Sequence, residues 1–330
     1  ATMREVLDTL VEGKSIEHKV TAVEGLTTQQ IVEKIRANPD LHGDIAEIPP
    51  EGSLLPDTYK FGRDDTRQEI VERMQAAQAK FLAKIWEQRD EGIVVQTPEE
   101  ALILASIVEK ETGRADERPH IASVFQNRLR KNMRLQSDPT IIYGIVGGKG
   151  VLDHPIQQDE LDRDTKYNTY KINGLPPTPI ACPGRAAIEA VLKPAKTKDL
   201  YFVADGKGGH VFAATLEDHN RNVAKWRQVE REIRAKEAQE AAAAAAATAA
   251  AGTTGEAEAA SAVPAAKGAA APALAPDETG AAGTVAADMP GAFADPEAMT
   301  GAADGAPLAA QAPTTAKGEA VPKPLRNPKR

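Results

Sequence analysis

The sequence of 330 residues carries a formal net charge of −8, which argues against nucleic acid as the main partner because phosphate binding needs a basic surface. Its single cysteine, Cys182, excludes an intrachain disulfide, and the absence of a run of about 18 apolar residues excludes a membrane span within the sequence. The chain begins at Ala1 inside an amphipathic segment, which is typical of a fragment that lacks an upstream anchor or signal.

The first part of the chain predicts a strand and a helix, followed by a turn, a second strand and a long helix. The first helix begins at Thr27 or Thr28, either of which can cap it, and Asn38 followed by proline ends it. Residues 51–61 combine the turn with the second strand. Residues 65–92 predict the long amphipathic helix, with one face formed by Ile70, Met74, Ala77, Phe81 and Ile85.

The second part of the chain predicts more helices, a proline-stiffened loop and a hairpin with a glycine-rich turn. These elements are a helix over 97–113, a helix over 116–132, a strand and loop over 167–184, a helix over 185–193, a hairpin over 199–216 and a helix over 216–237. Because strands and helices do not follow a regular βαβ order, the predicted fold class is α+β.

The composition changes abruptly near Glu237, beyond which the chain is mainly Ala, Gly, Pro, Thr and Glu. Such a segment buries too little apolar surface to offset the entropy of ordering it. We therefore expect residues 239–330 to be a low-complexity tail, mostly disordered, whose alanine run can extend the preceding helix. The rest divides into a small N-terminal part, residues 1–50, and a larger mixed α/β domain, residues 51–238.

Two glutamates, Glu109 and Glu111, lie near the end of the apolar helix over 97–113. Thr97 as N-cap, Pro98 as the next residue and Glu100 at the third position predict a capping box at its start. At about 100° per residue the two carboxylates point to opposite sides of this helix. Glu111 continues the apolar stripe Ile103, Leu104, Ile107, Val108, whereas Glu109 is in line with Leu102, Ala105 and Ser106.

Burial of Glu111 would raise the pKa of its carboxyl by disfavouring the charged form. An acid that stays protonated near neutral pH is what the departure of a glycosidic oxygen requires. The alternative is that Glu109 and Glu111 are solvated or pair with Lys110, Arg114 or Arg118. The helix pattern selects Glu111 without establishing catalysis.

Asp138 is the candidate for a second acid, which a two-carboxylate glycosidase would need at about 5–9.5 Å from the first. Because Asp138 precedes Pro139 and an apolar run, it can equally be the N-cap of a helix with proline at the first position. The two roles can coexist.

Several polar and aromatic side chains suit sugar hydroxyl and N-acetyl groups, namely Gln136, Tyr143, Tyr167, Asn168, Thr169 and Tyr170. In a strand over 167–170, Asn168 and Tyr170 would share one face, so only one pair would reach a glycan. His210, Glu217 and His219 lack a metal-binding spacing such as HExxH. We therefore expect no metal and no other cofactor, and we expect Cys182 to be a packing residue.

Seven segments, in chain order, resemble the YceG-like family of endolytic murein transglycosylases. They are ASIVEKET, NRL, MRLQSDPTIIYG, YNTY, GLPPTPIACPG, LYFVADGKGGHVF and HN. The resemblance is dense from about Glu51 to Trp226. Before Glu51 it is weaker, and VTAVEGLTTQQIVEKI is similar to the family's LysM-like subdomain, a module type associated with glycan binding. The tail has no counterpart in the family.

The resemblance implies a lyase of the bacterial inner membrane, with a single N-terminal membrane helix that this sequence lacks and a catalytic domain in the periplasm. Such enzymes cut nascent peptidoglycan strands internally between N-acetylmuramic acid and N-acetylglucosamine, leaving 1,6-anhydromuramic acid ends. The implied partners are the glycan strands and the membrane-bound glycan polymerases, including penicillin-binding proteins.

The second Glu of the family's EKET segment is its catalytic acid and base, and it corresponds to Glu111. The resemblance and the polar pattern together place Gln136, Asp138, Tyr143, Asn168, Tyr170, His210 and Asn220 at the substrate. Two alternatives stay open: a hydrolytic glycosidase that uses Glu111 with Asp138, and a non-catalytic glycan-binding scaffold in which the LysM-like part acts.

Overall fold

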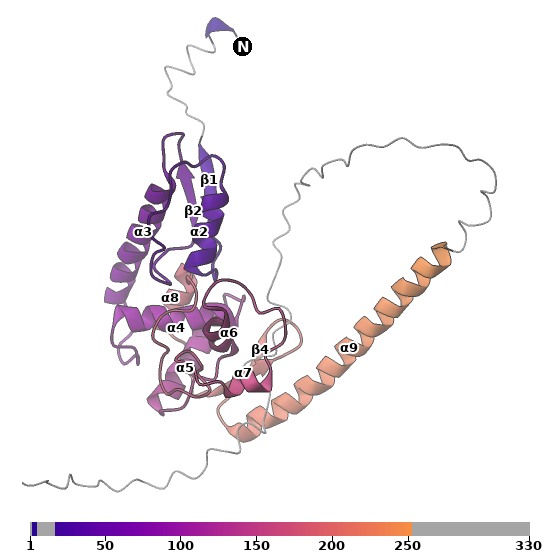
Figure 1. The fold of residues 1–330 in the computed structure, drawn as a ribbon. Coiled ribbons are helices and arrows are strands. Elements are labelled where there is room, and N and C mark those ends of the chain that lie inside the picture. The colour runs from indigo at the N-terminus through magenta and orange to yellow at the C-terminus, as the bar shows by residue number, and fades with distance from the viewer. Residues whose placement is uncertain (1, 5–16, 253–330) are drawn as a thin grey trace, which may run out of the picture. The chain divides into compact units, whose positions relative to one another are not determined.

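The computed structural model describes residues 2–4 and 17–252, and these contain an α+β arrangement of helices with two small sheets (Figure 1). The elements are β1 (His18–Thr21), α2 (Thr28–Ala37), β2 (Thr58–Phe61), α3 (Arg67–Glu87), α4 (Pro98–Glu111), α5 (Arg118–Arg130), α6 (Asp138–Val146), α7 (Gln158–Asp162), α8 (Arg185–Leu192), β3 (Tyr201–Ala204), β4 (His210–Ala213) and α9 (Leu216–Gly252). The predicted fold class is confirmed. Within the described residues, no helix is both long enough and apolar enough to span a bilayer.

The N-terminal elements form a small core of their own. β1 pairs antiparallel with β2, and Val20 lies opposite Tyr59. α2 begins with a capping box in which Thr27 and Gln30 bond reciprocally, and it ends at Asn38, as predicted. Its apolar face packs into a cluster of buried residues that includes Val20, Ile31, Val32, Ile35, Leu54, Ile70, Met74 and Cys182. The predicted boundary after residue 50 falls between the two paired strands.

Cys182 contributes to this N-terminal core from a loop far along the chain. Its thiol lies 3.3 Å from the Thr28 hydroxyl, and burial raises the pKa of the thiol to about 12. The backbone of this loop also pairs with the turn before α2, since Cys182 accepts a hydrogen bond from Gly25 N and donates one to Leu26 O. The predicted packing role of Cys182 is confirmed.

The second core lies around α4, which packs against α5, α6 and α8. Its fully buried side chains include Leu104, Ile107, Val108, Ile121, Phe125, Ile188, Val191 and Phe202. The rings of Phe125 and Phe202 meet edge to face with centroids 5.9 Å apart, which is a favourable aromatic geometry. This core encloses the helix that carries Glu109 and Glu111.

The hairpin of β3 and β4 and helix α9 complete the described chain. The strands pair antiparallel from Tyr201 opposite Ala213 to Ala204 opposite His210, and their glycine-rich turn has positive φ at Gly206, as a hairpin turn requires. α9 contacts both strands and continues to Gly252, so the alanine run does extend the helix. The predicted disorder of the tail beyond that point concerns residues 253–330, which lie outside the described residues.

Candidate active site

Helix α4 places Glu111 at its C-terminal end. The helix starts as predicted, with the Thr97 hydroxyl accepting a hydrogen bond of 3.1 Å from Glu100 N and with Pro98 as its first residue. The Glu100 carboxylate, however, accepts from Gln96 N at 2.6 Å. The predicted reciprocal capping box is therefore wrong in its second half, because the side chain of Glu100 reaches one residue further back.

Glu111 as a residue is partly exposed, and the Ser137 hydroxyl donates a short hydrogen bond of 2.5 Å to its Oε1. Burial raises the pKa of this carboxyl to about 8; the charge of Asp138 adds to the rise, while the Ser137 hydrogen bond and the charge of Arg128 oppose it. The expectation that burial raises the pKa of Glu111 is confirmed. The carboxyl is mainly protonated at neutral pH, as a general acid must be.

Glu109 is also buried, on the other side of α4. Its side chain is 5% exposed, and its carboxylate accepts hydrogen bonds of 2.9 Å from Arg118 Nη2 and of 2.9 Å from Gly184 N. The interpretation of Glu109 as a solvated residue is wrong, whereas the alternative of an ion pair with Arg118 is confirmed. The face of α4 that carries Ala105 and Ser106 is enclosed too, since Ser106 Oγ accepts a hydrogen bond from Ile180 N.

Glu109→Gln is expected to lower the free energy of unfolding by about 2–3 kcal/mol, because it leaves the buried Arg118 guanidinium without its nearest carboxylate. The loss stays moderate because Glu24 lies 3.6 Å from the same guanidinium. Urea denaturation at pH 7 measures the effect. Glu99→Gln, at an exposed position in the first turn of α4, is the matched control, and equal losses in the two variants would contradict the structural role of Glu109.

Asp138 is the first residue of α6, and Ser137 occupies the N-cap position. The interpretation of Asp138 as the N-cap is therefore wrong. Its carboxylate instead accepts a hydrogen bond of 2.6 Å from the Tyr170 hydroxyl. Burial raises the pKa of Asp138 to about 6, and the Tyr170 hydrogen bond opposes that rise. Asp138 is thus a second buried carboxyl near Glu111, mainly ionised at neutral pH.

Arg128 is a fully buried residue of α5 that holds the segment before α6. Its Nε donates to Leu200 O at 2.6 Å, and its Nη1 donates to Arg134 O at 3.0 Å, to Leu135 O at 3.2 Å and to Gln136 Oε1 at 3.0 Å. Burial lowers the pKa of this guanidinium to about 10, so it keeps its charge at neutral pH. Glu111, Arg128, Ser137, Asp138 and Tyr170 are called the acid cluster below.

Neither Arg128 nor Ser137 has a predicted role, although both lie in segments that resemble the family. Helical periodicity could have indicated Arg128, because it follows the buried Val124 and Phe125 by four and three residues. A charged residue on the inward face of an amphipathic helix needs a buried partner. No comparable signal pointed to the hydroxyl of Ser137.

The segment 167–170 is a turn and not the predicted strand. Asn168 is buried, and its Nδ2 donates to Leu161 O at 2.9 Å and to Arg163 O at 2.7 Å. Such side-chain bonds to nearby backbone compete with a strand ladder, so the predicted sharing of a strand face by Asn168 and Tyr170 is wrong. In the turn, Tyr170 reaches Asp138 while Asn168 ties the loop to the end of α7.

Three other predicted substrate residues do not contact the acid cluster through any hydrogen bond of the described residues. The Tyr143 hydroxyl donates to Glu51 Oε2 at 3.2 Å, and His210 Nδ1 lies 2.7 Å from Glu117 Oε2. Asn220 is exposed on α9. Gln136 does lie beside the cluster, through its bond to Arg128. Their roles in sugar binding stay predictions.

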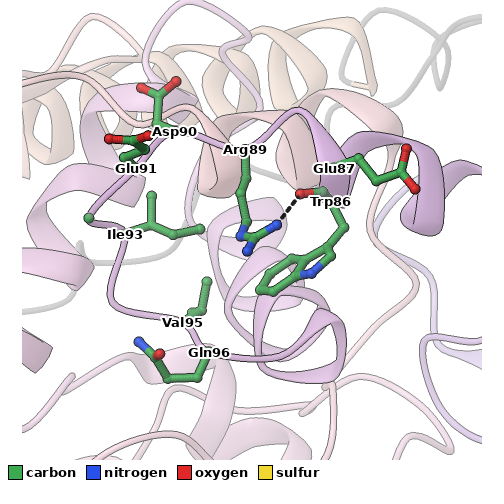
Figure 2. A pocket seen from close by; sticks show the side chains of 9 residues that line it. Trp86, Glu87, Arg89, Asp90, Glu91, Ile93, Val95 and Gln96 are labelled. Carbon is green, nitrogen blue, oxygen red and sulfur yellow. Dashed lines mark hydrogen bonds between the residues drawn. The ribbon is translucent and has the colours of Figure 1, made fainter.

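A hollow of about 610 Å³ lies at the connection between α3 and α4 (Figure 2), and no residue of the acid cluster lines it. Arg89 crosses it, with its guanidinium 4.2 Å from the centroid of the Trp86 ring and a hydrogen bond to Trp86 O. A second hollow, of about 390 Å³, lies along Asp65–Ala76. Neither is lined by Glu111, so a saccharide-sized groove at this residue stays a prediction. Among the described residues, no group of three or more His, Cys, Asp and Glu side chains could hold a metal ion.

Glu111→Gln is expected to gain stability relative to the wild type as the pH rises. The pKa of Glu111 in the folded chain is about 8, above its ordinary value of 4.5. The carboxyl therefore stabilises the fold fully below about pH 4.5, and this contribution is lost as the pH rises through 8, by at most about 1.4 kcal/mol per pH unit. Glutamine does not titrate. Urea denaturation of both proteins at pH 5 and pH 9 measures the effect, and a pH-independent difference would contradict it.

A family model and individual known proteins are similar to this chain. The model of the YceG-like family matches residues 1–225. An endolytic murein transglycosylase of Bacillus subtilis is 39% identical over 187 residues, which cover 57% of this chain and 51% of the relative. Its counterpart in Streptococcus pneumoniae is 38% identical over 179 residues, covering 53% and 32%. This chain thus spans about half the length of the first relative and about a third of the length of the second.

Among solved structures, a crystal structure of a yceG-like protein from Listeria monocytogenes is similar, with a TM-score of 0.50 and 33% sequence identity. The match covers 66% of this chain and 80% of that chain. The same architecture therefore occurs in a related protein of known structure.

Proposed function

The chain belongs to the YceG-like family, and we propose that it is an endolytic peptidoglycan lytic transglycosylase, a lyase that uses Glu111 as its acid and base. The relatives named endolytic murein transglycosylase support the reaction class. The single observation that carries the assignment to Glu111 is the pKa of its carboxyl, which burial raises to about 8 on a residue that is itself partly exposed. A group of this kind can hold a proton at neutral pH and still reach a substrate.

The proposed reaction uses one carboxyl group twice. Glu111 donates its proton to the oxygen that links N-acetylmuramic acid to N-acetylglucosamine, and the electron pair of the C1–O bond leaves with that oxygen. The resulting Glu111 carboxylate then accepts the proton of the muramic acid C6 hydroxyl while O6 bonds to C1. The products are a 1,6-anhydromuramic acid end and a new N-acetylglucosamine end, and water takes no part.

Asp138 supports the same step through its charge. Ionised at neutral pH, it lies close enough to Glu111 to raise the pKa of that carboxyl, and it can stabilise the positive charge that develops at C1. The second candidate function is a hydrolytic glycosidase. In that case Glu111 would be the acid, and the Asp138 carboxylate would be the base that activates water.

The small N-terminal unit, residues 1–50, is proposed to be the LysM-like glycan-binding part. In this proposal, a membrane helix anchors the enzyme in the bacterial inner membrane, and the acid cluster faces the periplasm. Its partners are nascent glycan strands and the membrane-bound polymerases, including penicillin-binding proteins, that make them. The scaffold alternative assigns function to the N-terminal unit alone.

Digestion of purified glycan strands with the full 330-residue chain, followed by mass spectrometry of the products, separates the three functions. We expect 1,6-anhydro ends. Reducing ends would favour the hydrolase that uses Glu111 with Asp138, and uncut strands that bind the protein would favour the scaffold.

A further inference from the structure

Ser137 is the N-cap residue of α6, yet its side chain makes no capping hydrogen bond. A serine at this position normally turns its hydroxyl back to the free N–H groups of its own helix. Here the hydroxyl instead donates to Glu111 Oε1 at 2.5 Å, across 26 residues of sequence. The chain thus forgoes a local stabilising bond in favour of a contact with the proposed acid.

The surrounding groups hold Ser137 in this orientation. Its backbone N–H donates to Thr169 Oγ1 at 2.9 Å, and its carbonyl accepts from Thr140 Oγ1 at 2.6 Å. The two threonine hydroxyls lie 2.9 Å apart, and all three residues are fully buried. The preceding Gln136 has a φ of 51°. This left-handed conformation is unfavourable for residues other than glycine. Strain beside a buried network of this kind is typical of a functional site.

We propose that Ser137 is a positioning residue of the proposed transglycosylase, whose hydroxyl fixes Glu111 Oε1 as a hydrogen-bond acceptor and thereby leaves Oε2 to carry the transferred proton. This inference rests on the proposed function. Within the described residues, no side chain bonds Oε2, and Glu111 as a residue is partly exposed. Oε2 is therefore the oxygen that a substrate can approach.

The same hydrogen bond acts on the carboxylate that forms after the proton has left. A hydroxyl donor stabilises the charged form of a carboxyl group, so it opposes the effect of burial on the pKa of Glu111. Without Ser137 the acid would hold its proton more tightly and would be a poorer donor to the glycosidic oxygen. The hydroxyl thus keeps Glu111 able both to give and to take back a proton.

The test is Ser137→Ala, studied by the pH dependence of anhydro-product formation. We expect a rate at neutral pH that is lower by about tenfold or more, together with an alkaline limb moved up by about one pH unit, as the loss of a hydrogen bond to a charged group implies. Ser137→Gly suits the N-cap position and replaces the alanine variant if that variant folds poorly. Ser123→Ala is the matched control, because it removes a buried serine hydroxyl of α5 that bonds the hydroxyl of Thr197, in the segment before β3, and is not part of the acid cluster.

A second measurement does not depend on activity. The infrared band of the protonated Glu111 carboxyl, identified by its loss in Glu111→Gln, is followed against pH in the wild type and in Ser137→Ala. We expect it to persist to higher pH in the variant and to be unchanged in Ser123→Ala. If the band and the alkaline limb both stay at their wild-type positions, Ser137 is merely structural and the inference fails. A wild type without anhydro products but with a shifted band in the variant would overturn the proposed function alone.

Discussion

Glu111→Gln is expected to lower the rate of glycan cleavage by about 10²- to 10⁴-fold, the usual contribution of a general acid and base. Glutamine has nearly the same shape and keeps an oxygen that can accept the Ser137 hydrogen bond, but it carries no transferable proton. The fold should survive, because the substitution replaces a carboxyl that is mainly protonated at neutral pH by a neutral amide. The measurement is the initial rate of product formation from glycan strands at pH 7.

The control for this prediction is Glu109→Gln, two residues earlier on the same helix. Its carboxylate binds Arg118 and Gly184 and, within the part of the chain that the structure describes, makes no hydrogen bond to the acid cluster. At a temperature well below its unfolding transition, this variant should keep most of the wild-type rate. If Glu109→Gln were inactive and Glu111→Gln active, the assignment of the acid would be reversed.

Arg128→Met is expected to lower the free energy of unfolding by about 3 kcal/mol or more, the largest loss of stability that we predict. The substitution fills a similar volume but removes the donor of hydrogen bonds to the carbonyls of Leu200, Arg134 and Leu135. Each buried acceptor left without a partner costs about 1–3 kcal/mol, which the recovered desolvation of the guanidinium offsets only in part. Urea denaturation at pH 7 measures the change.

Two further variants decide whether the geometry of the guanidinium matters. Arg128→Lys should recover little of the loss, because an ammonium group cannot span acceptors on both sides as the planar guanidinium does. Arg130→Met removes an exposed arginine of the same helix, with bonds to Asn127 and Gly92, and should cost less than about 1 kcal/mol. Equal losses in Arg128→Met and Arg130→Met would show that the buried network does not stabilise the fold.

Local chemistry made the secondary structure largely predictable. Thr27 and Thr97 cap the helices that their positions indicated, and the glycine-rich turn joins two apolar strands. The segment 167–170 was predicted incorrectly because its alternation of residue types resembles a strand, while the side chain of Asn168 bonds backbone carbonyls at the end of α7 and just after it. Strand propensity does not take account of a side-chain hydrogen bond to nearby backbone.

The acid cluster was predictable only in part. Helix periodicity selected Glu111 because one face of α4 is visibly apolar, but it misjudged Glu109 because the face with small residues is buried as well. Ser137 meets Glu111 across 26 residues, and Arg128 meets Leu200 across 72. Contacts of that range follow from how the helices pack, and no pattern within a single segment contains them.

The pKa of the Glu111 carboxyl, titrated by carbon-13 NMR with Glu111→Gln to identify the resonance, is the most direct test of the proposed chemistry. The structure predicts a value of about 8, so that the group carries a proton at neutral pH. A value near the 4.5 of an ordinary glutamate would mean that Glu111 is ionised in the resting protein and cannot be the acid that starts the reaction.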